Sequence, residues 1–182
     1  MIAPFIRGML VMLSALTITP SAIANDRARL TVGVPTYVSH PDKRHDTKGW
    51  NQGWLQNEGV IVDVTWPVKT LSRNTTFRAG ATGGVFDNSV FHTSVFVGGV
   101  GEIETRISEN LVLSLGAYAG AITGYENGVR PALAPYVSTS YALTDRFEIG
   151  ARGFWLPART LTGSAVAESD AYVAAVTLGT RF

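Results

Sequence analysis

The chain has 182 residues, with 15 basic and 14 acidic side chains and no cysteine. The length suits one domain, and the near balance of charge excludes the strongly basic surface of a nucleic-acid-binding protein. Hydrophobic residues make up 46% of the chain and 19 residues are glycine, which fits either a secreted domain without disulfides or a membrane barrel.

The first residues have the pattern of an export signal. Arg7 precedes the apolar run GMLVMLSALTITP, and the small residues Ala22 and Ala24 follow. The run is too short to span a bilayer, so we expect a secretory signal over residues 1–24, cleaved before Asn25 after Sec export. Residues 25–182 then form a single domain with 14 basic and 14 acidic residues.

After the signal, eight segments have strand-like patterns, and several alternate apolar and polar residues. They span 29–40, 57–66, 75–86, 93–105, 111–123, 131–143, 147–156 and 170–182. In the last segment Tyr172, Val176 and Leu178 share one face, while Thr177 and Arg181 lie on the other. Such a period of two is what a wall between lipid and lumen requires. We therefore predict an all-β fold, an eight-stranded antiparallel up-and-down transmembrane β-barrel.

The connectors predict how the barrel is oriented. Those near Asn110 and Asp145 are tight, and Pro67–Asn74 is a longer connector on the same side, whereas 41–56 and 157–169 are long and polar. Outer-membrane barrels have short periplasmic turns and long external loops. We therefore expect an integral protein of the bacterial outer membrane, a monomer, with both termini in the periplasm. His40 and the turn Asp87-Asn88-Ser89 then lie at the external rim.

The predicted inward positions change character along the barrel axis. Near the periplasmic end they form a plug of mixed charge that should pair internally: Arg29, Thr31, Asp63, Thr65, Arg78, Glu102, Glu104, Glu148, Arg152 and Arg181. Toward the outside they are apolar or small, and the predicted lining is Ile61, Phe86, Phe96, Gly98, Tyr118, Gly120, Ile122, Ala134, Phe154 and Val173. This outer half is either an ordinary apolar core or a pocket for one hydrocarbon chain, with the glycines adding space.

Four prolines lie within or at the ends of predicted strands: Pro35, Pro131, Pro135 and Pro157. Proline cannot donate to a ladder of hydrogen bonds and belongs at edges or breaks. A closed barrel has no edges, so these prolines either end strands or mark places where neighbouring strands part. In the second interpretation they are lateral gates through which a lipid tail enters.

Several motifs together resemble one family. They are GVPTYVSH, the loop sequence KGWNQG, FDNS, LSLGAYAGAITGY, RPALAPYVSTSY and FWLP, in this order along most of the chain after the signal. The sequence resembles the lipid A palmitoyltransferases (PagP-like enzymes). This resemblance implies an eight-stranded outer-membrane barrel that moves an acyl chain from a phospholipid to lipid A, with no cofactor and no metal.

The resemblance also implies a catalytic trio, His40, Asp87 and Ser89. A histidine held by a carboxylate could deprotonate an attacking hydroxyl, with Ser89 as nucleophile or oxyanion donor. In the family the aspartate and serine are adjacent, whereas Asn88 separates them here. Regular alternation places His40 on the lipid-facing parity with Val38, so only a bulge or the loop could bring it to Asp87. His92 is a second candidate for the base.

Other interpretations stay open at this point. Asp, Asn and Ser are also the residues that ordinary turns favour. A non-catalytic small barrel that stabilises the membrane or displays its loops is the main alternative. A lipid A deacylase, another eight-stranded barrel, is less favoured because no His-x-Ser-Asn-like run lies near the final strand.

Overall fold

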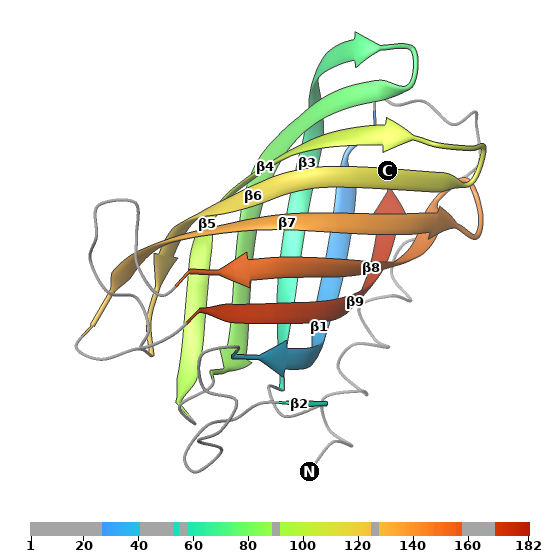
Figure 1. Ribbon diagram of the computed structural model, residues 1–182. Coiled ribbons are helices and arrows are strands. Elements are labelled where there is room, and N and C mark those ends of the chain that lie inside the picture. The colour runs from blue at the N-terminus through green and yellow to red at the C-terminus, as the bar shows by residue number, and fades with distance from the viewer. Residues whose placement is uncertain (1–26, 41–52, 55–57, 89–91, 125–127, 158–169) are drawn as a thin grey trace.

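The computed structural model describes residues 27–40, 53–54, 58–88, 92–124, 128–157 and 170–182. Within them, eight long strands pair in chain order. They are β1 (Arg29–Ser39), β3 (Gly59–Ser72), β4 (Thr75–Asp87), β5 (Thr93–Arg106), β6 (Leu111–Ile122), β7 (Arg130–Ala142), β8 (Phe147–Leu156) and β9 (Ala171–Arg181). All pairings are antiparallel, and β9 pairs with β1, so the sheet closes into a barrel (Figure 1). The predicted fold is confirmed; the predicted signal, residues 1–24, lies outside the described residues.

The outer face of the barrel is apolar. Its exposed side chains along the strands include Val62, Val95, Val97, Ile103, Leu113, Leu115, Val137, Ile149, Val176 and Leu178. Exposed aromatic residues lie at both ends of the strands, with Trp66, Tyr141 and Phe147 at the periplasmic end and Trp155 and Tyr172 at the external end. An apolar band between two aromatic girdles is the surface that a lipid bilayer covers. No helix among the described residues is long and apolar enough to cross a membrane.

The periplasmic half of the interior is charged, as predicted. All ten residues of the predicted plug are buried. Arg29 contacts Glu102 and lies 2.7 Å from Glu104, while Arg181 lies 3.1 Å from Glu104 and 3.2 Å from Glu148. Burying a charge is tolerable only where an opposite charge and hydrogen bonds accompany it. The four arginines and four carboxylates of this plug therefore brace the strands against one another.

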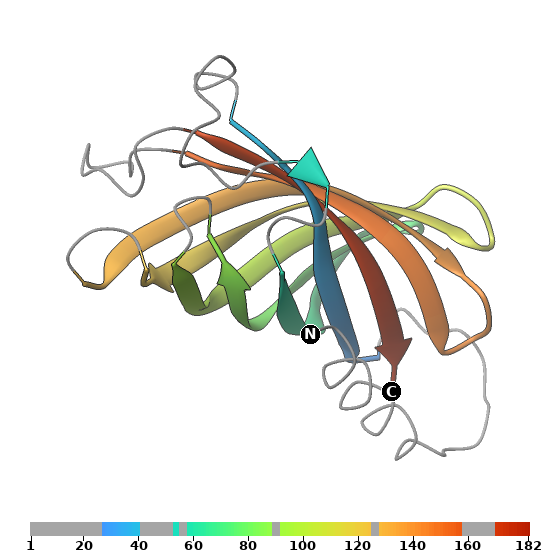
Figure 2. The same ribbon diagram turned by 90° about the horizontal axis from the view of Figure 1, so that it is seen from below.

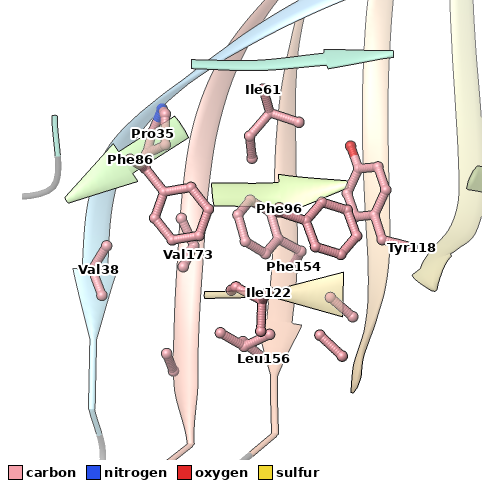
Figure 3. Close-up of a pocket in the computed structure, with 13 residues that line it drawn as sticks. Pro35, Val38, Ile61, Phe86, Phe96, Tyr118, Ile122, Phe154, Leu156 and Val173 are labelled. Atoms are coloured by element: carbon pink, nitrogen blue, oxygen red, sulfur yellow. The ribbon is translucent and has the colours of Figure 1, made fainter. Parts of the chain in front are cut away.

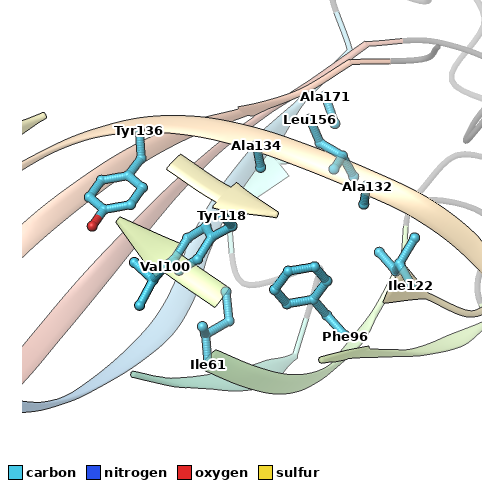
Figure 4. Close-up of a cluster of buried hydrophobic side chains, with 10 residues drawn as sticks. All are labelled: Ile61, Phe96, Val100, Tyr118, Ile122, Ala132, Ala134, Tyr136, Leu156 and Ala171. Atoms are coloured by element: carbon cyan, nitrogen blue, oxygen red, sulfur yellow. The ribbon is translucent and has the colours of Figure 1, made fainter. Parts of the chain in front are cut away.

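The external half of the interior is an apolar cluster (Figure 4). Its buried members are Ile61, Phe96, Val100, Tyr118, Ile122, Ala132, Ala134, Tyr136, Leu156 and Ala171. Tyr118 lies at its base, with ring centroids 6.0 Å from Phe96 and 4.9 Å from Tyr136. The Tyr118 hydroxyl donates to Asp63 at 2.9 Å and that of Tyr136 to Glu102 at 2.8 Å. These two tyrosines therefore join the apolar half to the charged plug.

One connector differs from the prediction. The segment expected as a loop, Pro67–Asn74, continues the β3–β4 hairpin almost to its tip, and only Arg73 and Asn74 form the turn. The register shifts between Pro67 and Lys69 and again between Thr70 and Ser72. Two bulges absorb the extra residues Val68 and Leu71, so the segment stays paired although its pattern is irregular. The hairpin extends beyond its neighbours at the periplasmic end (Figure 1).

Candidate functional site

His40 follows the end of β1, and a bulge in that strand decides which way it faces. β1 pairs with β9 from Arg29↔Arg181 to Pro35↔Ala175, and the register then resumes at Tyr37↔Ala174. Thr36 is the extra residue. Beyond it the alternation is reversed, so Val38 and His40 face inward with 3% and 0% of their surface exposed. Regular alternation predicts that both side chains face the lipid. This prediction is wrong, because the bulge beside Pro35 reverses the two faces of the strand.

The imidazole of His40 is held by the start of β9. Its Nδ1 lies 2.9 Å from the backbone oxygen of Asp170, the residue before β9. The carboxylate of Asp170 in turn accepts a hydrogen bond from the indole Nε1 of Trp155 at 3.1 Å. Burial lowers the pKa of His40 below its ordinary value of 6.5, because a charged imidazolium loses its hydration there. The ring is therefore neutral at neutral pH.

Asp87, at the end of β4, faces the other way. Phe86 faces the lumen, and Asp87 follows it on the opposite parity. The Asp87 carboxylate accepts a hydrogen bond from the Thr93 hydroxyl at 3.2 Å across its own hairpin, and its backbone N–H donates to the Glu58 carbonyl at 2.8 Å. These contacts place Asp87 and His40 on opposite faces of the wall, with β3 between β4 and β1.

Asn88 is fully buried and ties two external turns together. Its Nδ2 donates to the Gly124 carbonyl at 2.7 Å and to the Ser94 hydroxyl at 3.1 Å. Its Oδ1 accepts from the backbone N–H of His92 at 3.0 Å. The residue that separates Asp87 from Ser89 is thus a structural brace. Ser89 itself lies outside the described residues, and the side chain of His92 is exposed, so the catalytic trio stays a prediction.

An apolar cavity of about 50 Å³ lies in the external half (Figure 3). Its lining consists of Pro35, Val38, Ile61, Phe86, Phe96, Tyr118, Ile122, Ala132, Ala134, Phe154, Leu156, Ala171 and Val173. Eight of the ten predicted lining residues are among them; Gly98 and Gly120 instead lie in the wall between β5 and β6. An engineered apolar cavity that holds benzene measures roughly 150 Å³. The outer half is therefore well filled as it stands.

Two pairs of neighbouring strands part beside this cavity. The pairing of β7 with β8 runs from Ala142↔Glu148 at the periplasmic end only as far as Tyr136↔Phe154. The pairing of β7 with β6 continues further toward the external end, as far as Arg130. Among the described residues, the segment 130–135, which contains Pro131 and Pro135, has no partner in β8. β1 and β3 pair only from Arg29↔Thr65 to Gly33↔Ile61, and Pro35 lies just beyond. The end of β7 stands apart from those of β1, β8 and β9 in Figure 2.

Both partings border the cavity. Ala132 and Ala134 on β7 and Phe154 and Leu156 on β8 line it from the two sides of one parting. Pro35 and Val38 on β1 and Ile61 on β3 line it from the two sides of the other. The two-residue β2 (Gly53–Trp54) pairs with Tyr37 and Val38 and covers part of the exposed edge of β1. Pro157 follows the last residue of β8, where it ends the strand.

Sequence reasoning missed the residues that the bulge turns inward, Val38 above all, and the contacts of His40. A proline within a strand pattern is a signal for a bulge, and Pro35 could have predicted the reversal. Asp170 and Trp155 carry no such signal, because the contacts of Asp170 with Trp155 and with His40 depend on the closure of β9 onto β8 and β1. Among the described residues, no group of three or more histidine or acidic side chains could hold a metal ion.

A closed eight-stranded barrel with an apolar outer band, aromatic girdles and a charged lumen defines an integral outer-membrane β-barrel by fold. Solved structures agree. Neisserial surface protein A aligns with a TM-score of 0.57 at 11% identity, over 86% of this chain and 97% of that one. The attachment invasion locus protein Ail of Yersinia pestis gives 0.52 at 11% identity, over 86% and 97%. A de novo designed transmembrane β-barrel gives 0.51 at 11% identity, over 92% and 100%.

These likenesses show the fold alone. No known family matches the sequence, and no curated protein matches it either.

Proposed function

We propose that the outer half of this barrel takes in one hydrocarbon chain of a membrane lipid, and that the external rim transfers this chain to lipid A. The observation that carries the proposal is the position of the two strand partings. Both border the apolar cavity of the external half, and His40 lies two residues beyond its lining residue Val38.

The partings favour a route for lipid. In a bilayer every unpaired backbone N–H or C=O costs several kcal/mol, so a closed barrel normally pairs its strands along the full height of the hydrocarbon. Proline has no N–H to leave unsatisfied. Pro131 and Pro135 on β7 and Pro35 on β1 therefore reduce the cost of parting at the places where the ladders stop.

The cavity must widen to hold a chain. Phe86 and Phe154 are only partly buried and pack against the apolar cluster, so they are the side chains that can swing aside. Each methylene group that leaves water for such a cavity gains about 0.8 kcal/mol, but a chain that comes from the bilayer gains little. The main cost of admitting a lipid tail is therefore the displacement of the two rings.

The chemistry proposed for the rim is acyl transfer between oxygen atoms. A lipid A hydroxyl attacks the ester carbonyl of a phospholipid, the ester C–O bond breaks, and the hydroxyl proton passes through the base to the leaving lysophospholipid oxygen. His40 is the proposed base, since a neutral imidazole is the required form. The roles of Asp87 and Ser89 rest on the family resemblance.

A non-catalytic barrel is the second candidate, and specific contacts favour it. Asp87 and Asn88 are engaged in structural hydrogen bonds, Asp87 within its own hairpin and Asn88 also to the neighbouring turn at Gly124. The filled outer interior also suits a barrel whose core only packs. In this alternative the rim and its loops stabilise the membrane or meet a partner.

Mass spectrometry of lipid A from cells with and without the expressed gene separates the candidates. A gain of one acyl chain supports the acyltransferase, no change supports the non-catalytic barrel, and a loss of one chain supports a deacylase. His40→Asn and Ser89→Ala should abolish the gain while the folded barrel still migrates faster than its boiled form on a gel. If both variants transfer at the wild-type rate, the assignment of the site is wrong.

A further inference from the structure

We propose that Asp170, braced by Trp155, is the residue that positions His40, and that Asp87 takes no part in this. The consequence for catalysis rests on the proposed function; the contact itself does not.

The contact with Asp170 decides which ring nitrogen of His40 carries the proton. His40 Nδ1 lies 2.9 Å from a backbone carbonyl oxygen of Asp170. A carbonyl oxygen can only accept a hydrogen bond, so Nδ1 must carry the proton. Because burial favours the neutral ring, Nε2 is then the nitrogen that carries the lone pair. A general base needs that pair on the nitrogen away from its orienting partner.

The backbone carbonyl of Asp170 is itself held in place by neighbouring strands. Asp170 directly precedes β9, whose first residues Ala171 and Tyr172 pair with Leu156 and Trp155. The indole Nε1 of Trp155 donates to the Asp170 carboxylate at 3.1 Å. This hydrogen bond ties the side chain of the residue just before β9 to β8, so it restrains the peptide whose oxygen contacts the imidazole. Trp155 belongs to the external aromatic girdle, where an indole has one apolar face and one polar handle.

Asp87, the predicted partner of His40, lies on the wrong side of the wall. The Asp87 carboxylate is bonded to Thr93 and faces away from the lumen, whereas His40 is buried inside it. A carboxylate that faces outward from β4 cannot orient a ring that faces inward beyond β1 unless the ends of both strands rearrange. The orienting group of this barrel is therefore a backbone carbonyl, locked by a tryptophan–aspartate hydrogen bond.

The test reads the tautomer directly. Two-bond ¹H–¹⁵N spectra of ¹⁵N-histidine-labelled barrel in micelles distinguish an Nδ1–H ring from the commoner Nε2–H ring. The chain has three histidines, and His45→Gln and His92→Gln variants assign the signals. We expect His40 to be the Nδ1–H tautomer. Trp155→Phe and Asp170→Ala should shift it toward the mixed tautomers of a free ring, and Asp170→Asn, which keeps an acceptor for the indole, should not.

Two matched controls separate positioning from general damage. Asp87→Asn should leave the His40 signal unchanged, and Trp66→Phe removes a girdle tryptophan at the opposite end of the barrel. If lipid A acylation is observed, Trp155→Phe should lower its rate roughly tenfold or more, because a displaced base loses its alignment, and Trp66→Phe should not. An Nε2–H tautomer in the wild type, or a tautomer that changes with Asp87→Asn and not with Trp155→Phe, overturns the proposal. A wild-type barrel with the Nδ1–H ring and no acyl transfer would refute the proposed function alone.

Discussion

Gly98 on β5 and Gly120 on β6 lie directly opposite each other, and neither position has room for a Cβ atom. A Cβ on Gly98 would lie 2.3 Å from the Ala119 carbonyl oxygen, and one on Gly120 would lie 2.2 Å from that of Val97. Both residues face the concave side of the wall. The two glycines therefore let β5 and β6 bend tightly into a narrow barrel, and they add no space to the apolar cavity.

Gly120→Ala should destabilise the barrel by about 1–3 kcal/mol, because its methyl group must displace backbone of the neighbouring strand. Gly99→Ala is the matched control, since the nearest atom to a Cβ there lies 3.6 Å away, and it should change stability by less than about 0.5 kcal/mol. Urea unfolding in detergent micelles measures both. Equal stability of the two variants would contradict the close approach.

Arg152→Met should destabilise the barrel by about 3–5 kcal/mol, because it leaves the buried Asp63 carboxylate without its guanidinium. Arg152 also lies over the Tyr136 ring at 4.5 Å and contacts the Tyr118 hydroxyl. A second change, Asp63→Asn, should recover part of the loss in the same urea titration. Lys69→Met, on the exposed part of the β3–β4 hairpin, is the control for loss of one positive charge. A similar small effect of Arg152→Met and Lys69→Met would show that the plug does not brace the barrel.

Deletion of Thr36 should remove the bulge and leave Val38 facing the lumen. The chain has no cysteine, so a nitroxide on a single introduced cysteine reports the environment of one residue. In the full-length barrel, a label on Tyr37→Cys should collide with oxygen dissolved in the bilayer, and one on Val38→Cys should not. The deletion should leave both results unchanged, because without the extra residue the pair Tyr37↔Ala174 directly follows Pro35↔Ala175 in a regular register. An exchange of the two results would contradict the bulge, because it would show that Thr36 is a regular member of the strand.

The sequence is sufficient for those features that follow from strict alternation. The eight strands, the closure of the barrel and the charged plug are predicted because every second residue of most strands keeps its face. The reversal of inward and outward faces at Thr36 is not predicted. The sequence pattern through Val38 continues to look regular, although the pairing with β9 shifts there. The role of Asn88 is hidden for another reason. Its partners Ser94 and Gly124 belong to different hairpins, and nothing local tells a turn asparagine from a buried one.

His40 should make the barrel less stable in acid. Burial lowers its folded-state pKa below 6.5, so the unfolded chain takes up the proton first as the pH falls. Stability is therefore unaffected above about pH 7.5 and decreases as the pH falls through 6.5 toward the folded-state value. His40→Gln, which cannot be protonated, should remove this part of the pH dependence. Urea midpoints of wild type and variant between pH 8 and pH 5 measure the difference. Parallel curves would show that the ring is hydrated, contrary to its burial.

A disulfide across the parting of β7 and β8 should close the lateral route. Continuing the register of Tyr136↔Phe154 outward by two residues brings Ala134 opposite Leu156, so the pair Ala134→Cys and Leu156→Cys can be oxidised only when the two strands meet. Oxidation should block photocrosslinking of a phospholipid that carries a diazirine on its acyl chain to the barrel interior, and a reductant should restore it. The control pair, Thr139→Cys and Ala151→Cys, lies where the strands already pair, and its disulfide should change nothing. If the oxidised outer pair still captures the lipid at the wild-type level, the chain does not enter between β7 and β8, and the parting beside Pro35 is the remaining route.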